Sequence, residues 1–274
     1  MISAKILLDS KSPMGSRITT FQLKFHRFIL SEFNTHRMFS RNAASSRAIP
    51  TKKMLDQLRL DPAIPVKWGK NQPGMSATEE LSPVEQSLCL DAWLRARDNA
   101  IATVTALLET VPLHKQVINR LLEPWMWSHV IMTVTDHPTQ LGNFFSLRTD
   151  GNAPQPEMFQ LATIMQDAYK ASEPTLLHFG EWHLPLIKPA DLLTMGQQTA
   201  LMCSAARCAR VSYLNHDGTE PNVEKDIELF NQLYGSRHMS PFEHQAEPAA
   251  GWWANFKGWR SQRYVLENGD YDRL

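Results

Sequence analysis

The apolar and polar positions of this chain alternate and cluster in ways that predict both strands and helices. Apolar side chains recur through residues 17–33, which predicts one or two strands leading into a polar segment at 35–47. A long helix is predicted from Ser82 to about Thr110, because Ser82 offers a capping hydroxyl, Pro83 suits the first turn and Glu85 can return a hydrogen bond. The apolar stripe of this helix is expected to face the core or a subunit interface.

The rest of the pattern consists of shorter elements. A polar, proline-rich stretch at 49–75 predicts one short helix near residues 54–60. It also predicts a structured loop at 67–75, with either a lid or substrate role or a surface position anchored by Trp68. The remaining pattern predicts a strand at 130–135 and helices at 113–122, 142–148, 156–171, 192–210 and 223–234. We therefore expect a helix-rich α/β chain that forms a single domain over residues 1–274.

Charge and cysteine content narrow the function. The chain carries 28 Lys and Arg against 28 Asp and Glu, so no global field draws it to nucleic acid or to an acidic membrane. Its three cysteines have no metal-ligand spacing, which favours a reducing compartment. No apolar run reaches the ~18 residues of a membrane span, and residues 1–8 lack the features of a secretion signal. We expect a cytoplasmic protein with no metal site and no nucleic-acid or membrane partner.

The polar segment at 35–47 is the most informative part of the chain. It combines Arg37, Arg41 and Arg47 with several serine and asparagine side chains. Guanidinium groups bind phosphate oxygens in bidentate pairs, while neutral donors fix the geometry of the bound anion. No Gly-rich phosphate loop or GxGxxG turn is present, which argues against a P-loop kinase or a Rossmann dehydrogenase. The segment therefore predicts a local anion site of a different kind.

The order of residues in this segment resembles the signature of the flavin-dependent thymidylate synthases, R-H-R-x2-S-x-N-E-x-S-x-R. Two positions depart from that signature, since Thr35 replaces its first Arg and Ala43 replaces its Glu. The positions that agree are His36, Arg37, Ser40, Asn42, Ser45 and Arg47.

Three segments further along the chain also resemble this family. Residues 143–148 resemble its N-F-x-x-L-R segment, and Arg120 resembles the arginine that a helix sends to the substrate phosphate. Residues 205–207 and 240–244 resemble its A-A-R helix and its S-P-F-E-H turn. In the family these two segments normally precede the signature, so their position after it suggests a circularly permuted chain, which is tolerable when termini lie close together at the surface.

The resemblance implies a fold, a reaction and a set of site residues. The implied fold is α/β, with a central, mostly antiparallel sheet flanked by long helices. The implied enzyme uses FAD and NADPH to transfer a one-carbon unit from methylenetetrahydrofolate to C5 of dUMP and reduce it, giving dTMP, in a homotetramer with shared sites. The implied substrate-binding residues are Glu32, Ser45, Arg47, Arg120 and Arg148, and the implied FAD contacts are His36, Arg37, Asn143 and His244.

Arg148 is the residue to which we assign the catalytic role. An arginine placed against the oxygens and N3 of the pyrimidine favours an enolate-like form of the base, which polarises C5 toward an electrophile. The departures at Thr35 and Ala43 leave two alternatives open. One is a related C5 hydroxymethylase or methylase that accepts another pyrimidine nucleotide, and the other is a non-catalytic nucleotide- or flavin-binding homologue.

Overall fold

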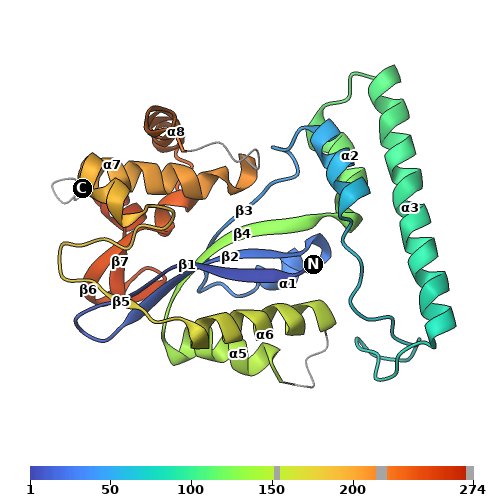
Figure 1. Cartoon of the computed structure of the whole chain (residues 1–274), viewed down its shortest axis with the longest axis horizontal. Coiled ribbons are helices and arrows are strands. Elements are labelled where there is room, and N and C mark those ends of the chain that lie inside the picture. The colour runs from blue at the N-terminus through green and yellow to red at the C-terminus, as the bar shows by residue number, and fades with distance from the viewer. Residues whose placement is uncertain (151–154, 214–220, 270–274) are drawn as a thin grey trace.

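The computed structural model describes residues 1–150, 155–213 and 221–269, and a five-stranded sheet lies at its centre (Figure 1). The strands lie in the order β3-β4-β2-β1-β5, and every neighbouring pair is antiparallel except β1 with β5. The predicted α/β class with a mostly antiparallel sheet is therefore confirmed. The strands are β1 (Ser3–Lys11), β2 (Arg17–His26), β3 (Ser40–Ala43), β4 (Trp127–Thr135) and β5 (Thr175–Leu176).

Side chains alternate between the two faces of the central strands, and each face packs against a different group of helices. One face carries Phe21, Leu23, Val130 and Met132, which are fully buried against α5 (Asn143–Arg148) and α6 (Pro156–Ala171). A π-helical turn at Pro138–Gly142 connects β4 to α5. Phe144 and Phe145 of α5 belong to this cluster, so the cluster fixes the position of α5 and of its last residue, Arg148.

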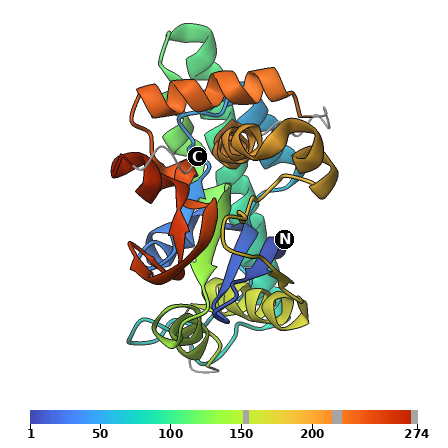
Figure 2. The same ribbon diagram turned by 90° about the vertical axis from the view of Figure 1, so that its left-hand side faces the viewer.

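The opposite face carries buried polar as well as apolar side chains. It lies beneath the β6 (Ala246–Trp253) and β7 (Phe256–Ser261) hairpin and the helices α7 (Pro189–Ala209), α8 (Val223–Gly235) and α9 (Gln262–Glu267). Gly196 interrupts α7 with a φ of 75°, a conformation that glycine adopts without strain. Figure 2 shows α5 and α6 on one side of the sheet and α7 and α8 on the other.

The third group of helices extends beyond the end of the sheet. It contains α2 (Thr51–Leu60), α3 (Pro83–Thr110), α4 (Lys115–Ile118) and a 3-10 helix at Asn119–Trp125. The predicted capping box of α3 is present, since Ser82 and Glu85 exchange hydrogen bonds. Part of its apolar stripe belongs to the core, since Ile101 and Val104 are buried and Trp93, Ala100 and Leu107 pack against the same cluster. Leu88 and Leu108 are exposed.

Three sequence-based predictions need correction. Residues 17–33 form one strand followed by the 3-10 turn Arg27–Ile29 and the short helix α1 (Leu30–Phe33), because Ile29 and Phe33 pack beneath the sheet instead of extending it. The 35–47 segment is not a simple turn at a strand end, since its centre forms the edge strand β3. The predicted helix at 113–122 is α-helical only at Lys115–Ile118, and Pro124, which lacks a backbone N–H, lies in the 3-10 helix that follows.

The other predicted helices agree with the structure to within a few residues. No helix in the described part of the chain is long and apolar enough to cross a membrane.

Candidate functional site

The 35–47 segment is held in shape by one of its own arginines. Arg41 donates to the side chain of Asn34 at 2.7 Å and to the carbonyls of Asn34, His36 and Phe39 at 2.8–3.1 Å. The guanidinium group of Arg41 is therefore hydrogen-bonded mainly to the backbone of the turn between α1 and β3. Arg41 therefore fixes the turn, and the remaining polar side chains of the segment are left to meet other elements.

One of these contacts joins the 35–47 segment, called the signature segment below, to α5. Arg148, the last residue of α5, donates from Nη1 to Oε1 of Glu32 at 2.5 Å and from Nε to Nε2 of His36 at 3.3 Å. The His36 ring also contacts Phe39 and Phe144, with centroids 5.7 and 4.8 Å away. Two segments that resemble the same family at separate places in the sequence thus meet in space.

The ionisation of His36 follows from this packing. Burial, followed by the positive charges of Arg148 and Arg41, lowers the pKa of His36 to about 4. At neutral pH the ring is therefore uncharged, and its Nε2 serves as the acceptor for Arg148. Glu32 consequently supplies the negative charge that holds the Arg148 guanidinium in place.

A second cluster surrounds the carboxylate of Glu123. Its Oε1 accepts hydrogen bonds from Arg120 at 3.0 Å, from Arg27 at 3.3 Å and from the Ser46 hydroxyl at 2.6 Å. These three donors come from the 3-10 helix at Asn119–Trp125, from the 3-10 turn that follows β2 and from the 35–47 segment. A converging set of two guanidinium groups and a hydroxyl is suited to an anion, and here a protein carboxylate occupies the position of that anion.

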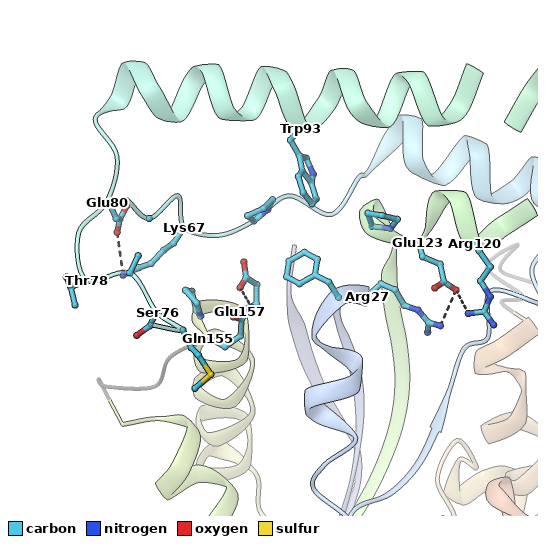
Figure 3. Close-up of a pocket in the computed structure, with 17 residues that line it drawn as sticks. Arg27, Lys67, Ser76, Thr78, Glu80, Trp93, Arg120, Glu123, Gln155 and Glu157 are labelled. Carbon is cyan, nitrogen blue, oxygen red and sulfur yellow. Dashed lines mark hydrogen bonds and ion pairs between the residues drawn. The ribbon is translucent and has the colours of Figure 1, made fainter. Parts of the chain in front are cut away.

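The Glu123 cluster lies at one end of a cavity of about 800 Å³ (Figure 3). Trp93 of α3, Glu157 at the start of α6 and Lys67 of the 67–75 loop line other parts of this cavity. The loop is tied down, because Glu157 accepts from the backbone N–H of Val66 at 2.9 Å and Lys67 pairs with Glu80. The 67–75 segment is therefore a structured loop that lines part of the cavity, with Trp68 packed edge-on against Trp93. Its lid or substrate role stays a prediction.

The two C-terminal motif segments also contact the signature. The Asn42 side chain of β3 donates to the carbonyl of Cys208, which follows the A-A-R residues in α7, at 2.9 Å. It accepts from the hydroxyl of Ser240, the first residue of the S-P-F-E-H turn, at 3.4 Å. Segments that are 166 and 198 residues apart in sequence therefore pack on one edge strand.

His244, at the end of that turn, is fully buried. Its Nδ1 is 2.9 Å from the hydroxyl of Thr133 on β4, and its Nε2 has no partner among the described residues. Burial lowers the pKa of His244 to about 3, so the ring is neutral at physiological pH. A neutral, buried histidine with one free ring nitrogen is suited to a directional hydrogen bond rather than to charge pairing.

The remaining predicted site residues lie at or near the surface. Arg37 and Arg47 are exposed and form no ion pair within the described ranges, and Asn143 is exposed at the start of α5. Ser45 is half-buried, and its hydroxyl lies 3.4 Å from the backbone N–H of Arg47. The described residues that line the cavity include Arg120 but not His36, Arg148 or His244. One chain therefore does not gather all the predicted residues into one cavity.

Sequence reasoning missed several residues of these clusters. Glu123 could have been found, because its spacing of three from Arg120 places both on one face of a helical turn. Arg27 and Ser46 gave no such signal, since they meet Glu123 from 96 and 77 residues away. His183, which hydrogen-bonds Thr20 from 163 residues away, was also invisible to pattern analysis.

This chain resembles known proteins in its three-dimensional structure and not in its sequence. No protein-family model and no curated protein matches this chain. The chain is similar in structure to a UMP/dUMP methylase, PolB from Streptomyces cacaoi, solved with bound 5-Br UMP. The match has 18% sequence identity and a TM-score of 0.49, and it covers 62% of this chain and 88% of that one.

Two structures of the flavin dependent thymidylate synthase ThyX from Helicobacter pylori, both with FAD and dUMP, are also similar to this chain. Each match has 17% identity and a TM-score of 0.38, and covers 56% of this chain and 67% of the other. At these identities the likenesses concern the path of the chain and assign no role to any residue.

Proposed function

We propose that this protein is a flavin-dependent enzyme that transfers a one-carbon unit to C5 of a pyrimidine nucleotide, with dUMP as the leading substrate and dTMP as the product. The observation that carries the proposal is the contact of Arg148 with both Glu32 and His36. Two motifs that were matched to one family independently come together there. The packing of the A-A-R and S-P-F-E-H segments on Asn42 supports the same assignment, because their reversed order in the sequence has not separated them in space.

In the proposed reaction, Arg148 acts on the pyrimidine. Its guanidinium group, held by Glu32 on one side and by the neutral His36 ring on the other, keeps part of its N–H set available for the base oxygens. These donors would stabilise the enolate-like form of the base, in which the oxygens carry the negative charge and C5 is nucleophilic enough to attack an electrophile. The one-carbon donor would be methylenetetrahydrofolate, with NADPH as the source of electrons.

The nucleotide phosphate is assigned to the cations of the signature segment and of the 3-10 helix. Arg47 and Ser45 are available for it, and Arg120 becomes available if the phosphate displaces the Glu123 carboxylate. A phosphate carries close to two negative charges, so it competes well with one carboxylate for a pair of guanidinium groups.

The residues present fit a flavin. The free, buried Nε2 of His244 is a polar atom that needs a partner, and Arg37 is an exposed cation suited to a diphosphate. When bound, FAD would supply the redox chemistry of the methyl-forming step. The role of His36, Arg37, Asn143 and His244 would be to bind and orient it.

A homotetramer with shared sites forms part of the proposal. The Arg120 cavity and the Arg148 cluster are separate within one chain, and α3 exposes Val84, Leu88 and Leu108 along its length. An exposed apolar face of this kind is suited to a subunit contact. Mixing an Arg47→Ala variant with an Arg148→Ala variant should restore part of the activity if each site takes residues from two chains. No restoration in verified mixed oligomers would refute shared sites.

The test of the reaction is product identification. The protein is incubated with FAD, NADPH, methylenetetrahydrofolate and a set of pyrimidine nucleotides, and the products are identified by mass. Formation of dTMP from dUMP supports the proposal. A product that retains a hydroxyl oxygen supports the C5 hydroxymethylase, while FAD binding without any product supports the non-catalytic homologue. Protein that cannot be reconstituted with FAD would exclude the flavoenzyme.

The hydroxymethylase remains as a second candidate because of the two departures from the signature. Thr35 donates to the carbonyl of Glu32 at 2.7 Å, and Ala43 packs at the edge of the main apolar cluster. A cation and a carboxylate of the family signature are thus replaced by side chains with local structural contacts. Loss of these charges next to the substrate could change the fate of the one-carbon unit after its transfer.

A further inference from the structure

A row of hydrogen-bonded side chains crosses the buried face of the sheet beneath the β6–β7 hairpin. The Ser10 hydroxyl is 2.8 Å from Nδ1 of His183, and Nε2 of His183 is 2.8 Å from the Thr20 hydroxyl. The Thr20 hydroxyl is 2.7 Å from that of Thr133, which is 2.9 Å from Nδ1 of His244. All five side chains are at most 1% exposed, so water does not compete for these bonds.

Three strands and two connecting segments build this row. Ser10, Thr20 and Thr133 lie on β1, β2 and β4, and Thr20 and Thr133 are directly opposite each other in the antiparallel register. His183 is placed by a bridge in which it exchanges backbone hydrogen bonds with Ala246. The row is therefore a product of the sheet register and of the chain that returns after β5.

The hydrogens in such a row cannot be arranged independently. Burial lowers the pKa of both His183 and His244 to about 3, so each ring is neutral and carries one N–H and one lone pair. Each hydroxyl likewise has a single hydrogen to donate. Five hydrogens serve four contacts, so one hydrogen lies outside the row, and the His244 ring has two possible arrangements, with its hydrogen on Nε2 or on Nδ1.

These two arrangements differ in how many groups they leave without a partner. In the first, the Ser10 hydroxyl donates to Nδ1 of His183 and the row continues until Thr133 donates to Nδ1 of His244, which leaves the His244 Nε2–H free. In the second, His244 donates from Nδ1, so the hydroxyl hydrogen of Ser10, Thr20 or Thr133 must point out of the row. That hydrogen has no acceptor among the described residues, and Nε2 of His244 is a free lone pair. The first arrangement leaves fewer polar groups unpaired, so it is preferred.

We propose that this row holds His244 as its Nε2–H tautomer and thereby presents a buried hydrogen-bond donor to an acceptor atom of a bound ligand, a carbonyl oxygen or a ring nitrogen. Ser10 and His183 act as positioning residues, because they set the direction of the row without touching that donor. The choice of FAD as the ligand rests on the proposed function. The tautomer itself does not, because it follows from the hydrogen bonds of the protein alone.

The tautomer can be measured directly in the ligand-free protein. Solid-state NMR of protein labelled with ¹⁵N in its histidine rings distinguishes protonated from unprotonated ring nitrogens, and His183→Gln and His244→Gln variants assign the signals by difference. In the wild-type protein, the His244 Nε2 signal should be that of a protonated nitrogen and the Nδ1 signal that of an unprotonated one. The opposite pattern would overturn the proposal.

A distant substitution tests the role of the row. Ser10→Ala removes the hydroxyl that favours the first arrangement, after which both arrangements leave the same number of unpaired groups. The ratio of Nε2–H to Nδ1–H tautomers at His244 should then fall about tenfold, which is the factor that corresponds to one hydrogen bond. Ser128→Ala is the matched control, since Ser128 is also 1% exposed and its hydroxyl has no partner within the described ranges.

Three outcomes of these measurements are decisive. A folded Ser10→Ala protein with an unchanged tautomer ratio would overturn the role of the row, and so would an equal change in Ser128→Ala. Addition of FAD should shift the His244 Nε2–H signal. Bound FAD that leaves this signal in place would overturn the ligand contact. If flavin fluorescence shows that FAD does not bind at all, the proposed function fails, whereas the tautomer result still stands on the apo protein.

Discussion

Lowering the pH from 7 to 5 should destabilise this protein through His183 and His244. Both rings are fully buried, and burial lowers the pKa of each to about 3 in the folded state, against about 6.5 in the unfolded chain. Because the folded pKa is the lower one, the unfolded state binds more protons between these values. The stabilisation is therefore present above about pH 6.5 and is lost progressively as the pH falls toward 3.

The size of the effect follows from the same two values. At pH 5 the unfolded state gains about 2 kcal/mol for each histidine, or about 4 kcal/mol for the pair, relative to pH 7. This is a large part of the ~5–15 kcal/mol that stabilises an ordinary domain. Urea unfolding at pH 7, 6 and 5 measures it, because the free energy of unfolding is obtained by linear extrapolation to zero urea.

Two variants isolate the contribution of one ring. In His183→Gln, the loss of stability between pH 7 and 5 should be smaller than in the wild type by about 2 kcal/mol, because one buried titrating group is gone. His178→Gln, at an exposed position five residues earlier, is the matched control and should keep the wild-type pH dependence. Equal pH dependence in His183→Gln and the wild type would refute the assignment of His183 as a buried neutral group.

Three further predictions concern single positions. Arg148→Ala should lower turnover by about 10²–10³-fold and leave the flavin absorbance in place, and an unaffected rate would refute its catalytic role. Asp226→Ala should destabilise the protein by about 3 kcal/mol in thermal unfolding, because the buried carboxylate pairs with two arginines of the α7 end. Gly258→Ala should lower the free energy of unfolding by more than about 1 kcal/mol, since the φ of Gly258 is 77° and a Cβ there would lie 2.6 Å from that of Ser16. Gly251 has a φ of 94° but open space around it, so Gly251→Ala should destabilise the protein less. An equal loss in the two variants would show that the backbone conformation, and not the contact with Ser16, causes the effect.

Local signals in the sequence were sufficient for most of the elements. The capping residues Ser82 and Glu85 located the start of α3, and the proline and glutamate at 156–157 located the start of α6. The prediction for residues 17–33 was wrong in its second half, since apolar side chains in a short run can be buried by a helical turn as well as by a strand. The periodicity of so short a segment does not distinguish the two.

The candidate site was predictable only in part, because motifs name residues without giving their contacts. The signature and the N-F-x-x-L-R segment indicated His36 and Arg148. These two residues are 112 positions apart in the sequence, and only the folded chain brings them into contact. The Glu123 carboxylate among the predicted phosphate ligands had no counterpart in any motif, since its partners Arg27 and Ser46 come from other parts of the chain.

The sequence by itself determined the class of elements and the chemistry of the side chains, because periodicity, caps and motifs are properties of neighbouring residues. Tertiary structure decided which of these residues meet. The register of β2 with β4 sets Thr20 opposite Thr133, and the return of the chain after β5 brings His183 to them. Burial then makes both histidines of that row neutral, an effect that depends on the whole surrounding fold and that no local pattern contains.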